Sequence, residues 1–159
     1  MELKNILIPI DFSHNSKKLV EVALDFKEKF NSNLSFLHII DKRSSLQVPL
    51  DYMYPELNIS IIDEKLYSDS IYEHANNLMK KFIEDMDLKN INNIKYDIVW
   101  GIPYSKIIEY SEENNYDLII IGSHGTSGIK HLLLGSVVDY VVHHSKIPLL
   151  IVKIKNNNK

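Results

Sequence analysis

The sequence predicts an open, doubly wound α/β fold, in which five parallel strands form one sheet with helices on both faces. Short segments rich in Ile, Leu and Val alternate along the chain with longer segments of helical periodicity. Several of the short segments are apolar at nearly every position, as in parallel strands that are covered on both faces. With 159 residues the chain fits one domain, which we expect over residues 1–155, followed by a frayed tail at 156–159.

Five strands are expected in order along the chain. They share a short length and a high content of β-branched apolar residues, and they cover Asn5–Ile10, Leu34–Ile40, Ile94–Val99, Leu118–Ile121 and Leu149–Ile154. Because a helical segment separates each pair, the connections are expected to be right-handed crossovers.

Helical periodicity fills the gaps between these strands. Ser13 is expected to cap a first helix that ends near Asn31, and a long amphipathic helix is expected from about Asp63. Pro103 suits the first turn of a third helix. Segment 42–62 is expected to be a long excursion over the surface, because prolines and polar residues interrupt any period there.

The last helix is expected from Gly135 to His144. Its valines should point inward, and they are Val137, Val138, Val141 and Val142. The chain then restarts as a strand after Pro148.

Composition excludes several classes of function. The net charge of −3 and the pI near 6.1 give no general attraction for nucleic acid or an anionic membrane. The absence of cysteine excludes disulfides and thiolate chemistry and suits a reducing compartment. The first residues lack a signal-peptide pattern, and no apolar run reaches the length of a membrane span. We therefore expect a cytoplasmic protein.

Glycine is concentrated in one segment. Four of the five glycines, Gly122, Gly125, Gly128 and Gly135, fall within fourteen residues, between the end of a strand and the start of the last helix. Glycine permits positive φ and lacks the Cβ that would hold the backbone away from phosphate oxygens. Ser136 adds a hydroxyl at the positive end of that helix. The pattern favours a phosphate site over a loop with glycines at turns, but it is neither a Walker loop nor a dinucleotide fingerprint.

The spacing Gly122-Ser-His-Gly125, nine residues, then Gly135-Ser136 resembles the ATP-binding signature of the universal stress protein family. Further similar segments are Ile8–Ser13, Leu37–Asp41, Gly101–Pro103 and Asp117–Ile120, so that only 42–62 and the tail are unmatched. The resemblance implies a Rossmann-like sheet with strand order 3-2-1-4-5. It also implies a homodimer through the last strand, whose apolar edge needs covering.

The resemblance also implies roles for individual residues. Contacts with phosphates and ribose are implied for Gly122, Gly125, Gly135, Ser136 and the backbone N–H of Val137. Pro9 and Asp11 are placed beside the nucleotide, with Asp11 accepting a hydrogen bond from a ribose hydroxyl, and Ile39 and Ile121 line the adenine pocket. From the residues alone, Asp11 is equally a helix-capping carboxylate, and Ile39 and Ile121 are core residues.

Three cationic or titratable residues of the glycine segment, His124, Lys130 and His131, are candidates for phosphate contacts, although charged loop residues are usually just solvated. No His or carboxylate cluster has the spacing of a metal site. We therefore expect Mg²⁺ or Mn²⁺ only as ions carried by the phosphates of ATP, ADP or AMP.

The expected function is that of an ATP-binding stress-response or signalling module. No catalytic constellation is visible, so hydrolysis of ATP should be weak at most. Two alternatives stay open, a dimeric interaction module that binds no nucleotide and a slow ATPase that depends on a partner.

Overall fold

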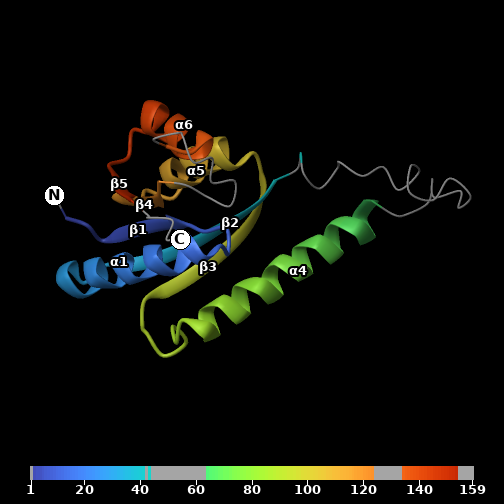
Figure 1. Ribbon diagram of the computed structural model, residues 1–159, viewed down its shortest axis with the longest axis horizontal. Coiled ribbons are helices and arrows are strands. Elements are labelled where there is room, and N and C mark those ends of the chain that lie inside the picture. Colours follow the sequence, from blue (N-terminus) through green and yellow to red (C-terminus); the bar gives the residue numbers. More distant parts are fainter. Residues whose placement is uncertain (1, 42, 44–63, 124–133, 154–159) are drawn as a thin grey trace, which may run out of the picture.

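The computed structural model describes residues 2–41, 43, 64–123 and 134–153 (Figure 1). The expected excursion at 42–62, apart from Arg43, and the expected tail lie outside these residues. The elements are, in chain order, β1 (Asn5–Pro9), α1 (His14–Phe30), β2 (Asn33–Asp41), α4 (Glu64–Asp85), β3 (Ile94–Gly101), α5 (Pro103–Glu113), β4 (Leu118–Gly122), α6 (Ser136–His144) and β5 (Leu149–Val152). All five expected strands are present, with ends that differ from the prediction by two residues or fewer.

The strands form one parallel sheet in the order β3-β2-β1-β4-β5, as the family resemblance implied. The chain moves outward from β1 through β2 to β3 and then returns to the other side of β1 to form β4 and β5. The strand order therefore reverses between β1 and β4. Ligands of open α/β sheets bind at the carboxyl ends of the strands beside such a reversal.

Helices cover both faces of the sheet (Figure 1). Because side chains alternate along a strand, Ile6 and Ile8 of β1 belong to the apolar core on the side of α1 and α4. Leu7 lies in the second core, with Ile107 of α5 and Val141 of α6. All five of these side chains are 2% exposed or less, so β1 is buried on both faces.

The ends of the helices correct two details of the prediction. Ser13 occupies the capping position of α1, but its side chain makes no capping hydrogen bond. In α6, Val138 and Val141 are buried, whereas Val142 is 38% exposed. The buried stripe of α6 is centred between Val138 and Val141, so that Val137 and Val142 flank it on opposite sides. The expectation that Val142 points inward was wrong.

Gly101 shows why a glycine ends β3. A Cβ at this position would lie 3.1 Å from the Cβ of Lys106, which is tighter than ordinary contact between carbon atoms. The glycine therefore lets α5 turn back closely against the strand that precedes it. Pro103 opens α5 as predicted.

None of the helices among the described residues is long and apolar enough to span a membrane.

Candidate functional site

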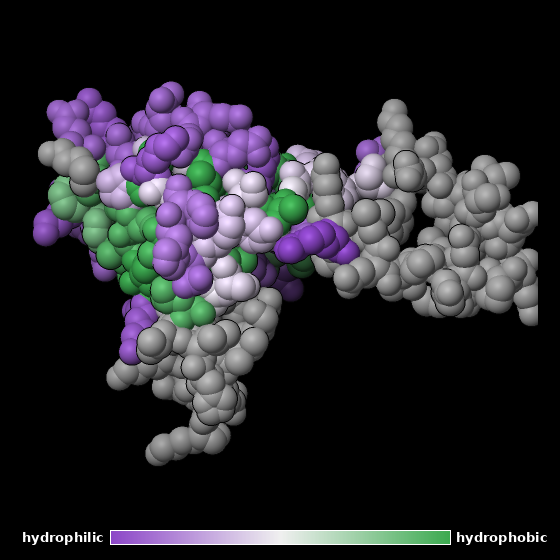
Figure 2. All heavy atoms as spheres, turned by 90° about the horizontal axis from the view of Figure 1, so that it is seen from above, coloured by the Kyte–Doolittle hydropathy of each residue, from purple (hydrophilic) through white to green (hydrophobic). Residues whose placement is uncertain are grey.

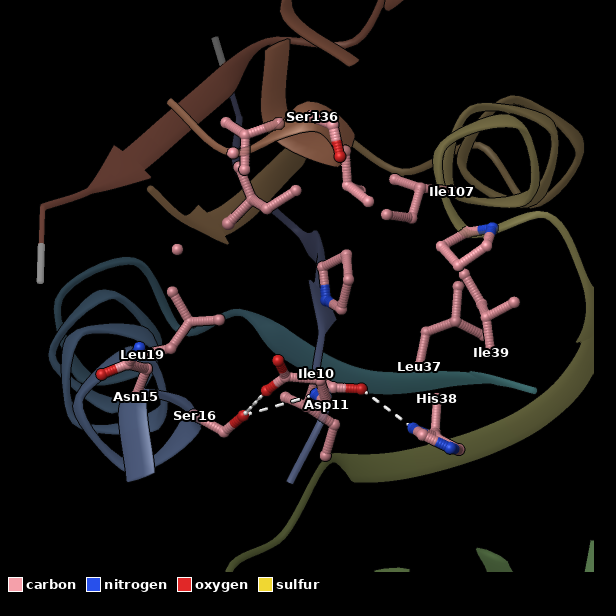
Figure 3. A pocket seen from close by; sticks show the side chains of 17 residues that line it. Ile10, Asp11, Asn15, Ser16, Leu19, Leu37, His38, Ile39, Ile107 and Ser136 are labelled. Carbon is pink, nitrogen blue, oxygen red and sulfur yellow. Dashed lines mark hydrogen bonds between the residues drawn. The ribbon is translucent and has the colours of Figure 1, made fainter. Parts of the chain in front are cut away.

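A pocket of about 240 Å³ lies at the carboxyl ends of β1, β2 and β4, where the strand order reverses. Its walls come from these strands and from α1, α5 and α6 (Figure 3). The residues that line it are Pro9, Ile10, Asp11, Asn15, Ser16, Leu19, Leu37, His38, Ile39, Pro103, Ile107, Ile121, Gly122, Gly135, Ser136, Val137 and Val138. Six elements that are distant in sequence therefore share one cavity.

The structure brings together every predicted site residue that it describes. The eight residues in question line this one pocket, and they are Pro9, Asp11, Ile39, Ile121, Gly122, Gly135, Ser136 and Val137. Gly125 and the candidate phosphate contacts His124, Lys130 and His131 lie outside the described residues.

The turn between β1 and α1 is built around Asp11. Its Oδ1 atom accepts hydrogen bonds from the Ser13 N–H at 3.1 Å and from the Ser16 hydroxyl at 2.9 Å. The first bond closes a turn just before α1, and the second ties this turn to Ser16 in the first turn of the helix, so Asp11 shapes the entry to α1 while it also lines the pocket. Phe12, the next residue, has a left-handed backbone with φ of 59°.

The start of α6 forms the opposite wall. Gly135 is the capping residue and, as a glycine, offers no side chain to cap the helix. Its N–H donates to the Ser123 carbonyl at 2.8 Å, which fixes the helix beside the end of β4. The first N–H groups of a helix have no acceptor within the helix. The start of α6 therefore presents backbone donors and the positive end of its dipole beside the pocket.

The glycines in this wall do not require positive φ. Gly135 has φ of −70° and ψ of 155°, and no glycine among the described residues has a positive φ. The expectation that positive φ explains them was wrong for Gly122 and Gly135. What distinguishes these two residues at the pocket is the missing Cβ, which lets a ligand approach the backbone.

A third part of the pocket is apolar. Ile107, Ile121 and Val138 are 5% exposed or less, and half-buried Ile39 comes from β2. The core interpretation of Ile121 is therefore correct as well, since the same side chain packs in the core and lines the cavity. Apolar walls with a few convergent polar groups are typical of sites for small molecules.

Sequence reasoning missed several lining residues. Asn15 and Ser16 lie in the first turn of α1, and Pro103 and Ile107 are four residues apart on α5. Helical spacing places Pro103 and Ile107 on one face of α5, but only the fold shows that this face and the first turn of α1 meet at the same strand ends. His38 was within a segment that the sequence singled out, although no role was assigned to it.

His38 lines the pocket from β2, beside Ile10 (Figure 3). Its Nδ1 atom lies 3.0 Å from the Ile10 carbonyl oxygen. Burial lowers the pKa of His38, and the bond to Ile10 and the charge of Asp11 oppose this effect without cancelling it. The neutral imidazole is therefore the favoured form at neutral pH.

The lone arginine pairs with a carboxylate that precedes it by two residues. Arg43 donates two side-chain hydrogen bonds to Asp41, at 3.0 Å and 2.7 Å, and these bonds lower the pKa of Asp41. Its guanidinium also lies 5.8 Å from the centre of the Tyr104 ring.

Among the described residues, no group of three or more His or carboxylate side chains could hold a metal ion. With the backbone donors at the start of α6 and its apolar walls, the described part of the pocket is equipped to hold an anion beside an apolar group.

The sequence profile of the universal stress protein family matches residues 2–153. Universal stress protein MJ0577 of Methanocaldococcus jannaschii is 35% identical over 161 aligned residues, which cover 97% of each chain. The solved structure of MJ0577 superposes with a TM-score of 0.77 and 31% identity and covers 99% of this chain and 100% of its own.

Two further solved structures have the same fold. Universal stress protein UspA from Lactobacillus plantarum superposes with a TM-score of 0.73 at 25% identity, covering 96% of this chain and 99% of its own. Another universal stress protein, solved in complex with cAMP, has a TM-score of 0.63 at 22% identity and covers 96% of this chain and 98% of its own.

Proposed function

We propose that this chain, which belongs to the universal stress protein family, binds an adenine nucleotide in the pocket between β1, β4 and α6. One observation carries the proposal. The eight described residues for which the family resemblance implies nucleotide contacts come from β1, β2, β4 and α6 and from the segments just after β1 and just before α6, and they line the same cavity at the reversal of strand order.

The chemistry of the walls favours a molecule with an apolar aromatic part and an anionic part. Ile39, Ile107 and Ile121 suit the flat face of adenine, since they offer apolar surface without competing polar groups. The start of α6 suits the phosphates, because its backbone donors and dipole favour negative charge. Asp11 is the group that we assign to a ribose hydroxyl. ATP, ADP and AMP all share these features.

A divalent ion would be bound by the phosphates. Magnesium prefers phosphate oxygens and water to a cage of protein ligands. The described residues provide no such cage, so Mg²⁺ or Mn²⁺ would depend on the nucleotide for its site.

We assign the protein a role in stress response or signalling that depends on whether the pocket holds a nucleotide. Asp11 is the one carboxylate among the pocket-lining residues, and Arg43 is engaged by Asp41. This arrangement favours holding ATP over cleaving it, so turnover would be weak at most. A cytoplasmic location stays a prediction from the sequence.

Titration calorimetry of the purified protein with ATP, ADP, AMP and cAMP, with and without Mg²⁺, tests the proposal. We expect heat of binding and a rise in melting temperature, because a ligand at about 100 times its Kd stabilises the folded state by about 2.7 kcal/mol. Neither heat nor stabilisation at millimolar nucleotide would favour the alternative of an interaction module without nucleotide. Steady phosphate release that is lost in Asp11→Asn would favour the slow ATPase.

We also propose a homodimer that pairs through β5. This strand lies at the edge of the sheet, is apolar throughout, and exposes 36% of Ile151. Seen from the side of α6, the surface carries an apolar patch (Figure 2). Tyr140 and Val142 of α6 are each 38% exposed. Analytical ultracentrifugation should give a dimer, and Ile151→Lys should shift it toward monomer. A monomeric wild type would contradict the proposal.

A further inference from the structure

We propose that His38 is a positioning residue for nucleotide binding, because its side chain holds the turn that carries Asp11 at the pocket. The inference rests on the proposed function, since it concerns how that pocket is shaped. His38 lines the pocket from β2, and no role follows for it from the predicted contacts.

Both backbone polar groups of Ile10, its N–H and its carbonyl, bond to residues of β2. Its N–H donates to the Leu37 carbonyl at 2.9 Å, and its own carbonyl lies 3.0 Å from Nδ1 of His38. A carbonyl oxygen can only accept, so Nδ1 of His38 must carry the hydrogen. The pairing of β1 with β2 ends at Pro9 and Leu37. The imidazole therefore replaces the next strand hydrogen bond and holds the chain one residue beyond the end of the strand.

The ring of His38 also supports the residue after Asp11. Phe12 has φ of 59°, a conformation that is sterically disfavoured for a residue with a Cβ. Its ring lies 4.3 Å from the His38 ring, between centres, and 6.0 Å from the ring of Phe82 on α4. Such a backbone conformation persists only where surrounding contacts hold it. Here the contacts come from His38 and Phe82.

Asp11 is thus held from two directions (Figure 3). Ser13 and Ser16 bind its carboxylate from the side of the helix, while His38 fixes Ile10 and Phe12 on either side of it along the chain. Burial lowers the pKa of His38, so the neutral form that donates from Nδ1 prevails at neutral pH. Without this donor, the Ile10 carbonyl would lose its partner and the turn its support on the strand side.

Two substitutions separate the hydrogen bond from the bulk of the side chain. His38→Leu keeps the approximate size of the side chain but removes the hydrogen-bond donor. In His38→Asn, the amide N–H can take the place of Nδ1–H. In calorimetric titrations with Mg²⁺ and ATP, we expect a Kd about tenfold weaker for His38→Leu and within about threefold of wild type for His38→Asn. Ile6→Val serves as the control, because it trims a buried residue at the far end of β1 and should leave the Kd unchanged.

A second measurement does not need nucleotide. Hydrogen exchange at the Ser13 amide, which donates to Asp11, reports whether the turn is held. We expect exchange about tenfold faster in His38→Leu and near the wild-type rate in His38→Asn and Ile6→Val. Equal Ser13 exchange in all four proteins would overturn the inference, as would equal ATP affinity. If the wild type bound no nucleotide, the proposed function would fail, and Ser13 exchange alone would then decide whether His38 holds the turn.

Discussion

The two walls that face each other across the pocket are built in opposite ways. The turn from β1 to α1 supplies its own polar partners, since the Asp11 carboxylate binds Ser13 and Ser16 and the imidazole of His38 binds Ile10. At the start of α6, Gly135 occupies the capping position and carries no side chain. The first wall contains side-chain hydrogen bonds within the chain, although the buried Ser13 hydroxyl has no partner among the described residues, and the second wall presents backbone donors to the pocket.

This difference indicates that the two walls have different roles in binding. A turn that is held by several internal hydrogen bonds is shaped before any ligand arrives, which lowers the entropic cost of binding. A helix start with Gly at the capping position gives up only about a few tenths of a kcal/mol relative to a Ser, Thr, Asp or Asn that hydrogen-bonds the helix N–H groups. A phosphate group would recover that interaction. We therefore assign the shape of the site to the first wall and the affinity for phosphate to the second.

The largest expected effect comes from giving α6 the cap that it lacks. In Gly135→Asp, the carboxylate would occupy the helix donors and repel phosphate, and two like charges about 4 Å apart cost about 4 kcal/mol near a protein surface. We expect ATP affinity to fall about a thousandfold while the melting temperature stays equal or rises by about 1 °C. The backbone at Gly135, with φ of −70°, puts no strain on a residue that carries a Cβ.

The matched control for this prediction is Gly135→Asn, which caps without charge and should weaken ATP binding much less. Calorimetry and thermal denaturation measure both quantities. If Gly135→Asp bound ATP as tightly as wild type, the start of α6 would not be the phosphate site.

The second effect breaks the opposite wall. Asp11→Ala removes the acceptor of Ser13 and Ser16 together with the carboxylate assigned to the ribose. We expect a loss of about 1 kcal/mol in the free energy of unfolding and of about 2–4 °C in melting temperature. ATP affinity should fall about 10- to 100-fold, because the lost hydrogen bond involves a charged group. A variant that lost affinity at unchanged stability would show that Asp11 does not organise the turn.

A smaller effect is expected at the exposed hydroxyl of Ser136, which lines the pocket at the first position of α6. Ser136→Ala should weaken ATP binding about three- to tenfold, since one solvent-accessible hydrogen bond is lost and the backbone donors are kept. Stability should not change measurably. Titration with AMP beside ATP shows which phosphate is involved, and a larger loss for AMP would place the contact next to the ribose.

The smallest expected effect is a pH dependence of folding stability, and it arises from His38 beside the turn from β1 to α1. The pKa of His38 is lower in the folded protein than in the unfolded chain, so below about pH 6.5 the unfolded chain takes up a proton that the folded protein does not. Stability should therefore fall as the pH drops from about 6.5 toward the folded pKa of His38. Urea denaturation across this range should show a weaker dependence in His38→Asn. The same slope in both proteins would contradict the assigned burial of the imidazole.

Much of the fold could be predicted because the apolar pattern is strong. Ile6, Leu7 and Ile8 are apolar in succession, which only a strand covered on both faces tolerates, and they are fully buried on both sides of β1. Val142 was misplaced because its position on α6 lies at the margin of the buried stripe, where sequence periodicity cannot decide between core and surface.

From the residues alone, the site was predictable where its signal is local, whereas Pro9 and Ile39 were placed at the pocket by the family resemblance. The glycine spacing marked Gly122 and Gly135 correctly as pocket residues, although the reason based on positive φ was wrong. His38 and Ile107 were missed because their position depends on how β2 and α5 meet at the strand ends. No periodicity within one segment carries that information.

The most direct test of the account is an amide NMR titration of the full chain with ATP and Mg²⁺. If the pocket between β1, β4 and α6 binds nucleotide, the largest shifts should occur at Ser136, Val137 and Val138, with a second group at Asp11 to Ser16. Residues on the distant β3 edge, such as Lys95, should not shift. Shifts confined to other surfaces, or none at millimolar ATP, would contradict the central claim that this pocket is a nucleotide site.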